Sequence, residues 1–387
     1  MKKRTIAAII ISILAIIIYV AINNISSSND NQTIRGKVLK VIQTTNTNTN
    51  AKGSNKSTMT QNMVSVQILN GPHKGQIINV DNLVNDKTSH EAFAKKGDSV
   101  LLNITENDNG TIKSAYIYEL VRYYDIYALI ILFVILLSVI GGKKGVKSIV
   151  GLAITGIVIL KVLLPLILAG YNPITVSLIL CIGVSILNLL IISGRNKKTY
   201  AAIIGTVGGV LIAAAIAYYF STVLRLTGLS DDELQMLVYI SQNQSFDFRG
   251  LLFSGILMGA LGAVMDISMS IASAVNEINE NSEEISFKEL IRAGMNVGRD
   301  IMGTMANTLI LAYVGGSMYT FMLVSSYNLS INRMIDQDLI ASEILKALAG
   351  SIGLVFTIPI TAIATAWLIK NFKPKKEKAE ERIIDKL

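Results

Sequence analysis

Small and polar residues recur at helical spacing inside one long apolar segment of this chain. The set comprises Gly255, Gly259, Gly262, Asp266, Ser270, Ser273 and Glu277. Steps of three or four residues place all of them on one face of a helix. A carboxylate within an apolar helix is costly in a bilayer unless it has a partner, water or a function. Two explanations stay open: a helix-packing seam with a satisfied polar contact, or a polar site inside a helix bundle.

A second polar stripe begins the next apolar segment. Asp300, Gly303, Thr304 and Asn307 share one helix face, and Arg299 precedes them. Because consecutive membrane helices run in opposite directions, the two stripes are expected at overlapping depths. The predicted polar intramembrane site comprises Asp266, Ser270, Ser273, Asn276, Glu277, Arg299, Asp300, Thr304, Asn307 and Lys161. The predicted helix-packing positions are Gly255, Gly259, Gly262 and Gly303, which serve either contacts within one chain or a dimer interface.

Lys161 is an unexpected cation in an apolar segment, with Pro165 one turn later. Two interpretations stay open. Its ammonium group pairs with Asp266 across the bundle, or its long side chain extends to the outer membrane surface.

The apolar segments that contain these polar residues are predicted to be membrane spans. The 387 residues are 51% hydrophobic and 16% charged, and the hydrophobic residues form long blocks, which exclude a single soluble core. The expected spans are Thr5–Ile22, Tyr124–Ile140, Val146–Leu168, Asn172–Ser193, Thr199–Phe220, Leu251–Val275, Ile301–Val324 and Glu343–Ile369. The predicted fold class is a polytopic α-helical membrane protein of about eight transmembrane helices with a small extracytoplasmic all-β domain.

Lysine and arginine recur in every second connection between these spans. They precede the first span, follow the second, fourth and sixth, and follow the last one. Positive residues favour the cytoplasmic side, so both termini are expected in the cytoplasm, with residues 24–123 outside the cell membrane. The net charge of +8 is therefore interpreted as a topology signal, and no nucleic-acid partner is expected.

The first span, within residues 1–23, is interpreted as a signal anchor. A cleaved signal peptide is the alternative, but the apolar run is long and no small-x-small cleavage pattern follows it. The only cysteine, Cys181, lies within a span, so no intramolecular disulfide can form. His73 and His90 lack clustered ligands nearby, and no metal or cofactor is expected.

Residues 31–122 are expected to form the β-rich domain. Five short segments alternate apolar and polar residues, and turn signals such as Asn109-Gly110 separate them. This pattern predicts a small barrel of the oligonucleotide/oligosaccharide-binding (OB) type. Residues 46–62, rich in Asn, Thr and Ser, are expected to be a disordered insertion.

The remaining divisions are a membrane domain of seven helices over residues 124–370 and a charged cytoplasmic tail over 371–387. Ser286 and Glu289 form a capping-box pattern, which predicts a short cytoplasmic helix ahead of the seventh span. Residues 286–298 are therefore a candidate docking segment for a cytoplasmic protein.

Two long motifs carry a family resemblance. Residues 262–278 read GAVMDISMSIASAVNEI, and residues 298–316 read GRDIMGTMANTLILAYVGG. With these motifs the chain resembles the YibE/F-like family of bacterial membrane proteins, over spans two to eight. The β-rich domain also fits the layout of that family. The resemblance implies a multi-span membrane protein and no particular activity.

Three classes of function are compatible with these features to different degrees. The preferred one is a transporter or channel for a small polar solute or ion, with a polar site between the sixth and seventh spans. The alternative is a non-transporting receptor or accessory subunit with an exported β-domain and a cytoplasmic docking helix. An intramembrane enzyme is least supported, because the chain has no HExxH motif and Gly262–Asp266 does not match GxGD. The expected partners are the lipid bilayer, the solute and the cytoplasmic protein, and the oligomeric state is left open.

Overall fold

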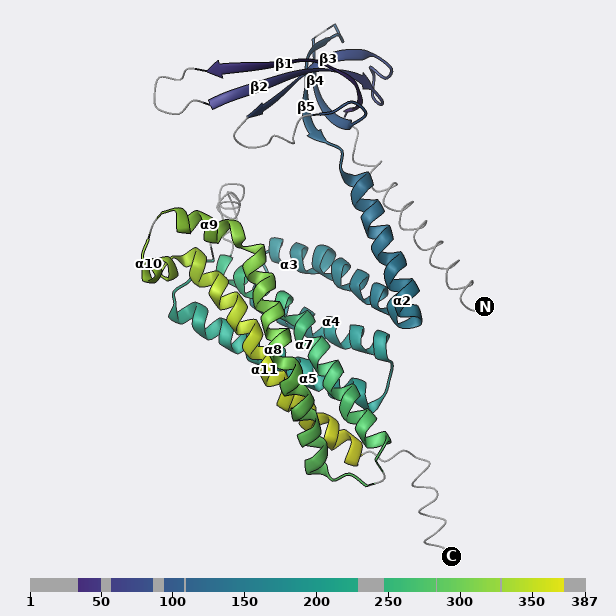
Figure 1. The fold of residues 1–387 in the computed structure, drawn as a ribbon, viewed down its shortest axis with the longest axis vertical. Coiled ribbons are helices and arrows are strands. Elements are labelled where there is room, and N and C mark those ends of the chain that lie inside the picture. The colour runs from purple at the N-terminus through teal and green to yellow at the C-terminus, as the bar shows by residue number, and fades with distance from the viewer. Residues whose placement is uncertain are drawn as a thin grey trace, which may run out of the picture. The chain divides into compact units, whose positions relative to one another are not determined.

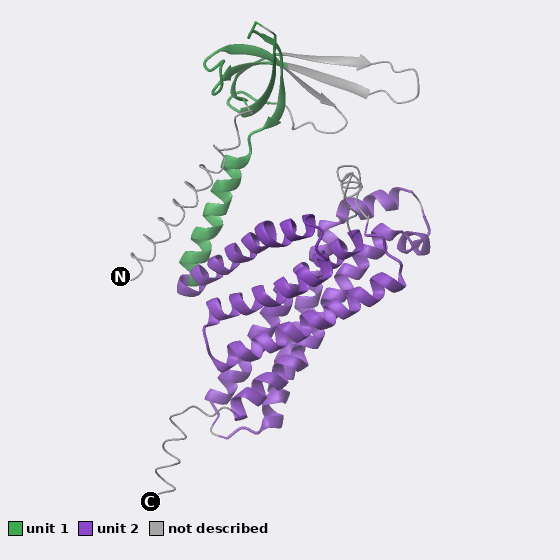
Figure 2. Ribbon diagram, turned by 180° about the vertical axis from the view of Figure 1, so that it is seen from behind, with its two compact units in different colours: residues 1–141 green, residues 142–387 purple. Residues whose placement is uncertain are grey.

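The computed structural model describes residues 34–49, 57–85, 94–107, 109–228, 247–282, 284–327 and 329–371. The expected first span and nearly all of the expected tail lie outside these residues. The chain divides into two compact units, Met1–Gly141 and Gly142–Leu387, which are coloured separately in Figure 2.

The first unit contains a closed five-stranded barrel (Figure 1). Its strands are β1 (Ile34–Thr49), β2 (Ser57–Ile68), β3 (Ile77–Asn85), β4 (Ser99–Glu106) and β5 (Ile112–Leu120), in the spatial order β1-β2-β3-β5-β4. Neighbouring strands are antiparallel except for β3 and β5, which pair in parallel. Val64, Val66 and Ile68 alternate along β2 and are buried in the barrel core, as the period of two requires.

The expected insertion at residues 46–62 lies only partly within the described residues. Residues 46–49 end β1 and residues 57–62 begin β2, and the two segments pair in register, with Asn46 opposite Thr60. Backbone hydrogen bonds can form such a ladder in a mainly polar sequence, and the β-branched threonines in the segment favour extended backbone.

The second unit is a helix bundle, which α2 (Tyr123–Val158) enters from the first unit. Gly142 interrupts α2 with φ 54° and ψ −132°, a conformation that favours glycine. The π-helix η1 (Ile159–Leu163) and α3 (Leu164–Leu168) follow directly, with Pro165 in the first turn of α3. Because Pro165 lacks a backbone N–H, it cannot donate the hydrogen bond that an α-helix would make to the turn before it. The hydrogen-bond pattern changes to that of a π-helix in this preceding turn, η1.

The rest of the bundle is formed by α4 (Pro173–Ser193), α5 (Lys197–Val223), α7 (Phe248–Glu280), α8 (Phe287–Gly316), α9 (Met318–Ser326), α10 (Ile331–Ile335) and α11 (Asp338–Asn371). Helix α7 packs against α4, α5, α8 and α11. Its buried residues, including Ile256, Val264 and Ile271, belong to the main hydrophobic core of the unit.

Five helical stretches of the described residues are long and apolar enough to cross a membrane: Tyr123–Leu168, α4, α5, α7 and α11. Helices α8 and α9 are bent by 60° at their junction and would together make a sixth. The protein is therefore mostly helical and consistent with a multi-pass membrane protein.

The expected short helix and seventh span are one continuous helix, α8. Its start is as expected, because Ser286 and Glu289 form the complete capping box. Two glycines within α8 allow close packing. A Cβ atom on Gly294 would lie 2.8 Å from the Cβ of Ala362, and one on Gly298 would lie 2.1 Å from Cγ2 of Ile358. Glycine lowers helix propensity by only about 1 kcal/mol, and packing against α11 offsets that cost.

Candidate functional site

Apart from Gly259, the polar stripe of α7 lies on a face that the described helices leave uncovered. Gly255, Gly259, Gly262, Asp266, Ser270 and Glu277 are exposed, and Ser273 is half-buried. The opposite face of α7 is buried against its neighbours. The helical spacing therefore places these residues together, but on the outside of the single chain.

Asp266 lies near the middle of α7 and has no hydrogen-bond or ion-pair partner among the described residues. Ser268, two residues later, is fully buried and donates its hydroxyl to the carbonyl oxygen of Val264 (2.8 Å). Asp266 itself points to the uncovered face. A packing seam within one chain does not explain a carboxylate in this position.

The second stripe lies on an uncovered face of α8. Arg299, Asp300, Gly303, Thr304 and Asn307 are all exposed. Thr304 donates its hydroxyl to its own helix, at the carbonyl oxygen of Ile301 (2.9 Å). In the part of the chain that the structure describes, no hydrogen bond joins this stripe to that of α7.

The two stripes nevertheless lie at the same depth. Tyr313 of α8 contacts the carbonyl oxygen of Ile256, with its hydroxyl 3.5 Å away. Gly294 lies nineteen residues before Tyr313 in α8. A Cβ atom on Gly294 would lie 2.9 Å from Cγ2 of Val275 on α7. Helices α7 and α8 are therefore antiparallel, and Asp266, midway between Ile256 and Val275, lies level with the region around Thr304.

Asn276 and Glu277 line a polar cleft at one end of the bundle. Its volume is about 1040 Å³, and its walls come from the ends of α7 and α11 and the starts of α5 and α8. The charged residues of the lining are Lys197, Lys198, Lys370, Glu277, Glu280, Glu284 and Glu289. The stripe of α7 runs from this cleft through Ser273 and Ser270 to Asp266, about one helical turn per step.

Lys161 lies in the π-helix η1 and its side chain is exposed. Helix η1 packs against α3 and α4. The described residues contain no ion pair between Lys161 and Asp266, so the structure does not bring this lysine into the stripe.

Among the expected packing glycines, only Gly259 approaches another helix. A Cβ atom there would lie 2.0 Å from the hydroxyl oxygen of Tyr313. No described atom lies within 4 Å of such a Cβ on Gly255, Gly262 or Gly303. Within one chain these three glycines therefore do not serve helix packing.

The closest glycine-mediated crossing joins α5 and α11, and the sequence reasoning missed it. A Cβ atom on Gly205 would lie 1.8 Å from Oγ1 of Thr361, and one on Gly209 would lie 1.8 Å from Oγ1 of Thr357. The four-residue spacing of small residues in α5 was the signal that could have found this contact.

An ion pair on α11, between the buried Glu343 and the half-buried Lys346, was also missed. Glu343 is 9% exposed and accepts a hydrogen bond from Nζ of Lys346 (2.5 Å) and another from the hydroxyl of Ser317. The signal was an acid and a base three residues apart at the beginning of an apolar segment.

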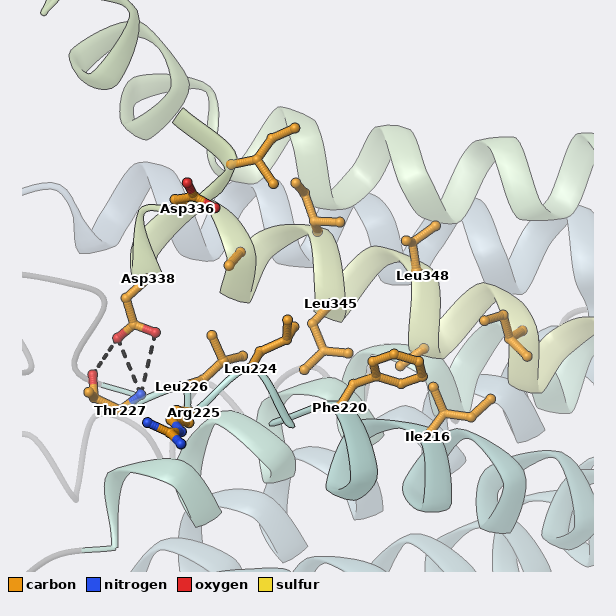
Figure 3. A pocket seen from close by; sticks show the side chains of 15 residues that line it. Ile216, Phe220, Leu224, Arg225, Leu226, Thr227, Asp336, Asp338, Leu345 and Leu348 are labelled. Carbon is orange, nitrogen blue, oxygen red and sulfur yellow. Dashed lines mark hydrogen bonds between the residues drawn. The ribbon is translucent and has the colours of Figure 1, made fainter. Parts of the chain in front are cut away.

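A second pocket, of about 610 Å³, lies between the end of α5 and the start of α11 (Figure 3). Its wall is mainly apolar, with side chains such as Phe220 and Leu345, and Arg225 and Asp338 lie at one end of it. Asp338 accepts hydrogen bonds from the backbone N–H (3.3 Å) and the hydroxyl of Thr227. The described residues contain no group of three or more His, Cys, Asp or Glu side chains placed to hold a metal ion.

Comparison with protein families decides the relationship of the chain. The description "YibE/F-like protein" matches residues 129–371, which contain both polar stripes. The chain belongs to the YibE/F-like family. Residues 28–120 separately match the description "YibE/F family N-terminal domain", which covers the β-barrel.

Family membership confirms the resemblance carried by residues 262–278 and 298–316. The family descriptions name no activity, so the function has to be argued from the site. Comparisons with curated proteins and with solved structures find no similar protein.

Proposed function

We propose that this YibE/F-like protein is a transporter or channel for a small polar solute or ion, with its site between the sixth and seventh transmembrane helices, α7 and α8. The observation that carries the proposal is Asp266: an unpartnered carboxylate in the middle of an apolar helix, on an uncovered face that leads to a polar cleft.

The carboxylate of Asp266 is energetically costly in a membrane. An Asp at the centre of a membrane helix costs about 2.5–3.5 kcal/mol on insertion scales when it has no compensation. A helix face with an uncompensated carboxylate is therefore expected to border water or a bound solute. Ser270 and Ser273 extend its polar character toward the cleft, over the roughly 16 Å that separate Glu277 from Asp266 along the helix.

The proposed role of Asp266 follows from its charge. Its carboxylate would bind a proton or a small cation that reaches it from the cleft, and exchange between the two membrane faces would couple movement to a gradient. Thr304 and Asn307, at a similar depth on α8, offer hydroxyl and amide oxygens beside the route.

Eight spans and their orientation are part of this proposal. The stretch Tyr123–Leu168 has 46 residues, so its length is about 69 Å, more than twice the apolar thickness of a bilayer. The interruption at Gly142 supports dividing it into two spans. With α4, α5, α7, the α8–α9 pair and α11 these make seven, and residues 5–22 would supply the eighth.

The distribution of basic residues supports a cytoplasmic location for both termini and the polar cleft, and a location outside the cell membrane for the barrel. The five-stranded closed barrel with its parallel β3–β5 contact supports an OB-like assignment of that domain.

The second candidate is a receptor or accessory subunit without transport. It is favoured by the first turns of α8, where Phe287 is 40% exposed and Lys288 and Arg292 are exposed beside the cleft. An exposed aromatic residue flanked by cations is suited to a cytoplasmic protein partner that binds at residues 286–298.

The experiment compares a deletion strain with the wild type for growth and metabolite content under ion, pH and antimicrobial stress. Asp266→Asn and Asp300→Asn are then tested for complementation at matched membrane abundance. Asparagine keeps the shape of the side chain but removes its charge, so Asp266→Asn should fail, whereas Asp300→Asn, nearer the membrane surface, should complement largely. Full complementation by Asp266→Asn would remove this residue from the site and favour the receptor or accessory role.

A further inference from the structure

The apolar pocket between α5 and α11 has a charged end that the proposed transport site does not use. Its volume of about 610 Å³ lies in the range of sites for small organic ligands. Phe220 and Leu224 of α5 and Leu348 of α11 belong to its wall, and each of them is 42–50% exposed. An apolar hollow that joins exposed side chains in this way is typical of a binding surface.

The pocket is about as long as one leaflet of a bilayer. On α11 its lining runs from Asp338 to Ile352, which corresponds to about 21 Å of helix. Half of a bilayer, with its headgroup region, measures about 20–22 Å. Arg225 lies two residues beyond the end of α5, which is long and apolar enough to cross a membrane. The charged end of the pocket is therefore expected at the level of the lipid headgroups, and the apolar wall at the depth of the acyl chains.

Arg225 has a backbone conformation that arginine rarely adopts. Its φ is 52°, and it is the only residue other than glycine with a positive φ among those that the structure describes. Glycine is the usual residue at such a position after a helix, because a Cβ atom disfavours the left-handed region. A residue keeps a strained backbone where its surroundings fix the conformation, and such residues occur often at ligand sites.

The turn that carries Arg225 is fixed by its neighbours. Leu226, the next residue, is 2% exposed, and its carbonyl oxygen accepts a hydrogen bond from Nε of Arg249 (3.1 Å). Thr227 donates its backbone N–H and its hydroxyl to Asp338 at the start of α11. The guanidinium group of Arg225 is therefore attached to a well-held segment at the end of the pocket.

Two opposite charges at this end are available to a ligand. Arg225 and Asp336 both line the pocket and both are exposed. Figure 3 shows them at the same end, Arg225 on the segment after α5 and Asp336 on the segment before α11. Among the described residues, neither side chain takes part in a hydrogen bond or an ion pair. A matching ligand would carry an anionic group for the guanidinium and a cationic donor for the carboxylate.

We propose that this pocket binds one zwitterionic phospholipid, whose headgroup carries a phosphate and a primary ammonium group. The planar guanidinium of Arg225 donates two parallel hydrogen bonds to the phosphate oxygens. The ammonium group donates a hydrogen bond to Asp336, and one acyl chain lies along the apolar wall of α5 and α11. The proposal does not depend on the transport function, because a receptor or accessory subunit would bind the same lipid in the same place.

The charges at the pocket end distinguish this headgroup from three others. A lipid with a phosphate but no cation, such as phosphatidylglycerol, would bring a second negative charge to Asp336. Phosphatidylcholine keeps the cation, but its quaternary ammonium group has no N–H to donate to the carboxylate. Diacylglycerol has no phosphate for Arg225. Phosphatidylethanolamine carries both groups and should therefore bind most tightly.

Quenching of a tryptophan in the pocket measures this selection. The chain has one tryptophan, Trp367, so Trp367→Phe combined with Phe220→Trp leaves a single reporter in the pocket wall. The protein is reconstituted in phosphatidylcholine vesicles that contain the same mole fraction of one lipid with brominated acyl chains. Brominated phosphatidylethanolamine should show a relative binding constant severalfold above those of the other three brominated lipids. A reporter from Ile179→Trp on α4, 62% exposed and outside the lining, should show no such preference.

Three variants assign the selection to the two charges. Arg225→Gly removes the guanidinium and suits the positive φ, so the variant should fold at least as well and should lose the preference over diacylglycerol. Asp336→Asn should lose the preference over phosphatidylcholine and phosphatidylglycerol. The matched control is Arg333→Gln on α10, an exposed cation outside the lining, which should keep every preference.

Equal quenching of the pocket reporter by all four lipids would overturn the proposal, as would tighter binding of phosphatidylglycerol than of phosphatidylethanolamine. Retention of the original preferences by both Arg225→Gly and Asp336→Asn would equally overturn it. If Phe220→Trp does not accumulate, Leu348→Trp on the α11 wall supplies the reporter and is judged by the same criteria. Complementation by Asp266→Asn is measured separately, so the lipid site and the transport function can fail independently.

Discussion

Tyr313 of α8 lies directly over Gly259 of α7, so that a Cβ atom on Gly259 would lie 2.0 Å from the tyrosine hydroxyl oxygen. The same hydroxyl is 3.5 Å from the carbonyl oxygen of Ile256. The absence of a side chain at Gly259 therefore allows the two helices that carry the polar stripes to approach each other.

Gly259→Leu should lower the abundance and thermal stability of the protein in detergent. A leucine must displace Tyr313 and separate the helices, at a cost of about 1–3 kcal/mol for an overpacked contact. The matched control is Gly255→Leu, one turn earlier on the same face, where no described atom lies within 4 Å of a Cβ position. Equal stability of the two variants would contradict a specific contact at Gly259.

Gly209→Ala should destabilise the crossing of α5 and α11. Its methyl group would lie 1.8 Å from Oγ1 of Thr357 and 3.0 Å from the carbonyl oxygen of Gly353. Alanine in a helix interior otherwise gains about 1 kcal/mol over glycine. Gly183→Ala on α4, where the space is open among the described residues, should therefore keep or raise the melting temperature, and Gly209→Ala should lower it. A higher melting temperature for both variants would rule out the tight crossing.

The capping box of α8 should weaken in acid. Hydrogen bonds from the backbone N–H and the side chain of Ser286 lower the pKa of Glu289 below its ordinary value. A lowered pKa means that the stabilisation is fully present above the ordinary pKa of the carboxyl group, and is lost as the pH falls through the lowered value.

Amide hydrogen exchange of the first turn of α8, compared between variants at each pH, checks this expectation. Glu289→Ala should remove the protection at neutral pH, whereas Glu289→Gln should keep only the part that a neutral acceptor supplies, because glutamine also completes a capping box but carries no charge. The difference between the original protein and Glu289→Ala should shrink at acidic pH. A difference that is constant with pH would show that the ionised carboxylate is not what holds the turn.

The proposed topology can be tested with reporter fusions. Reporters after Asn196 or Pro374 should be cytoplasmic, and reporters near Gly53 or Asp232 should be exported, because basic residues recur in alternate connections. An exported reporter at Asn196 would overturn the arrangement of all spans.

Several features could be predicted from the sequence because they depend on local geometry. Long apolar blocks require a membrane or a large buried core, and the alternation of apolar residues in β2 allows few folds other than a sheet. The residues from Gly255 to Glu277 share one face of α7 because the helical period alone decides that. The capping box at Ser286 is likewise local, since its two hydrogen bonds join residues three apart.

Only the tertiary structure decided what each face contacts. The sequence pattern suggested that Gly262 and Gly303 pack against helices, whereas the closest glycine contacts among the described residues are those of α5 with α11. The pattern also suggested a break before the seventh span, but packing of Gly294 and Gly298 against neighbouring side chains keeps α8 continuous. The bond from Ser317 to Glu343 joins positions 26 residues apart. Helical periodicity fixes the direction of a side chain around its own axis, but its partner depends on which other helix packs there, and that depends on the sum of many contacts across the bundle.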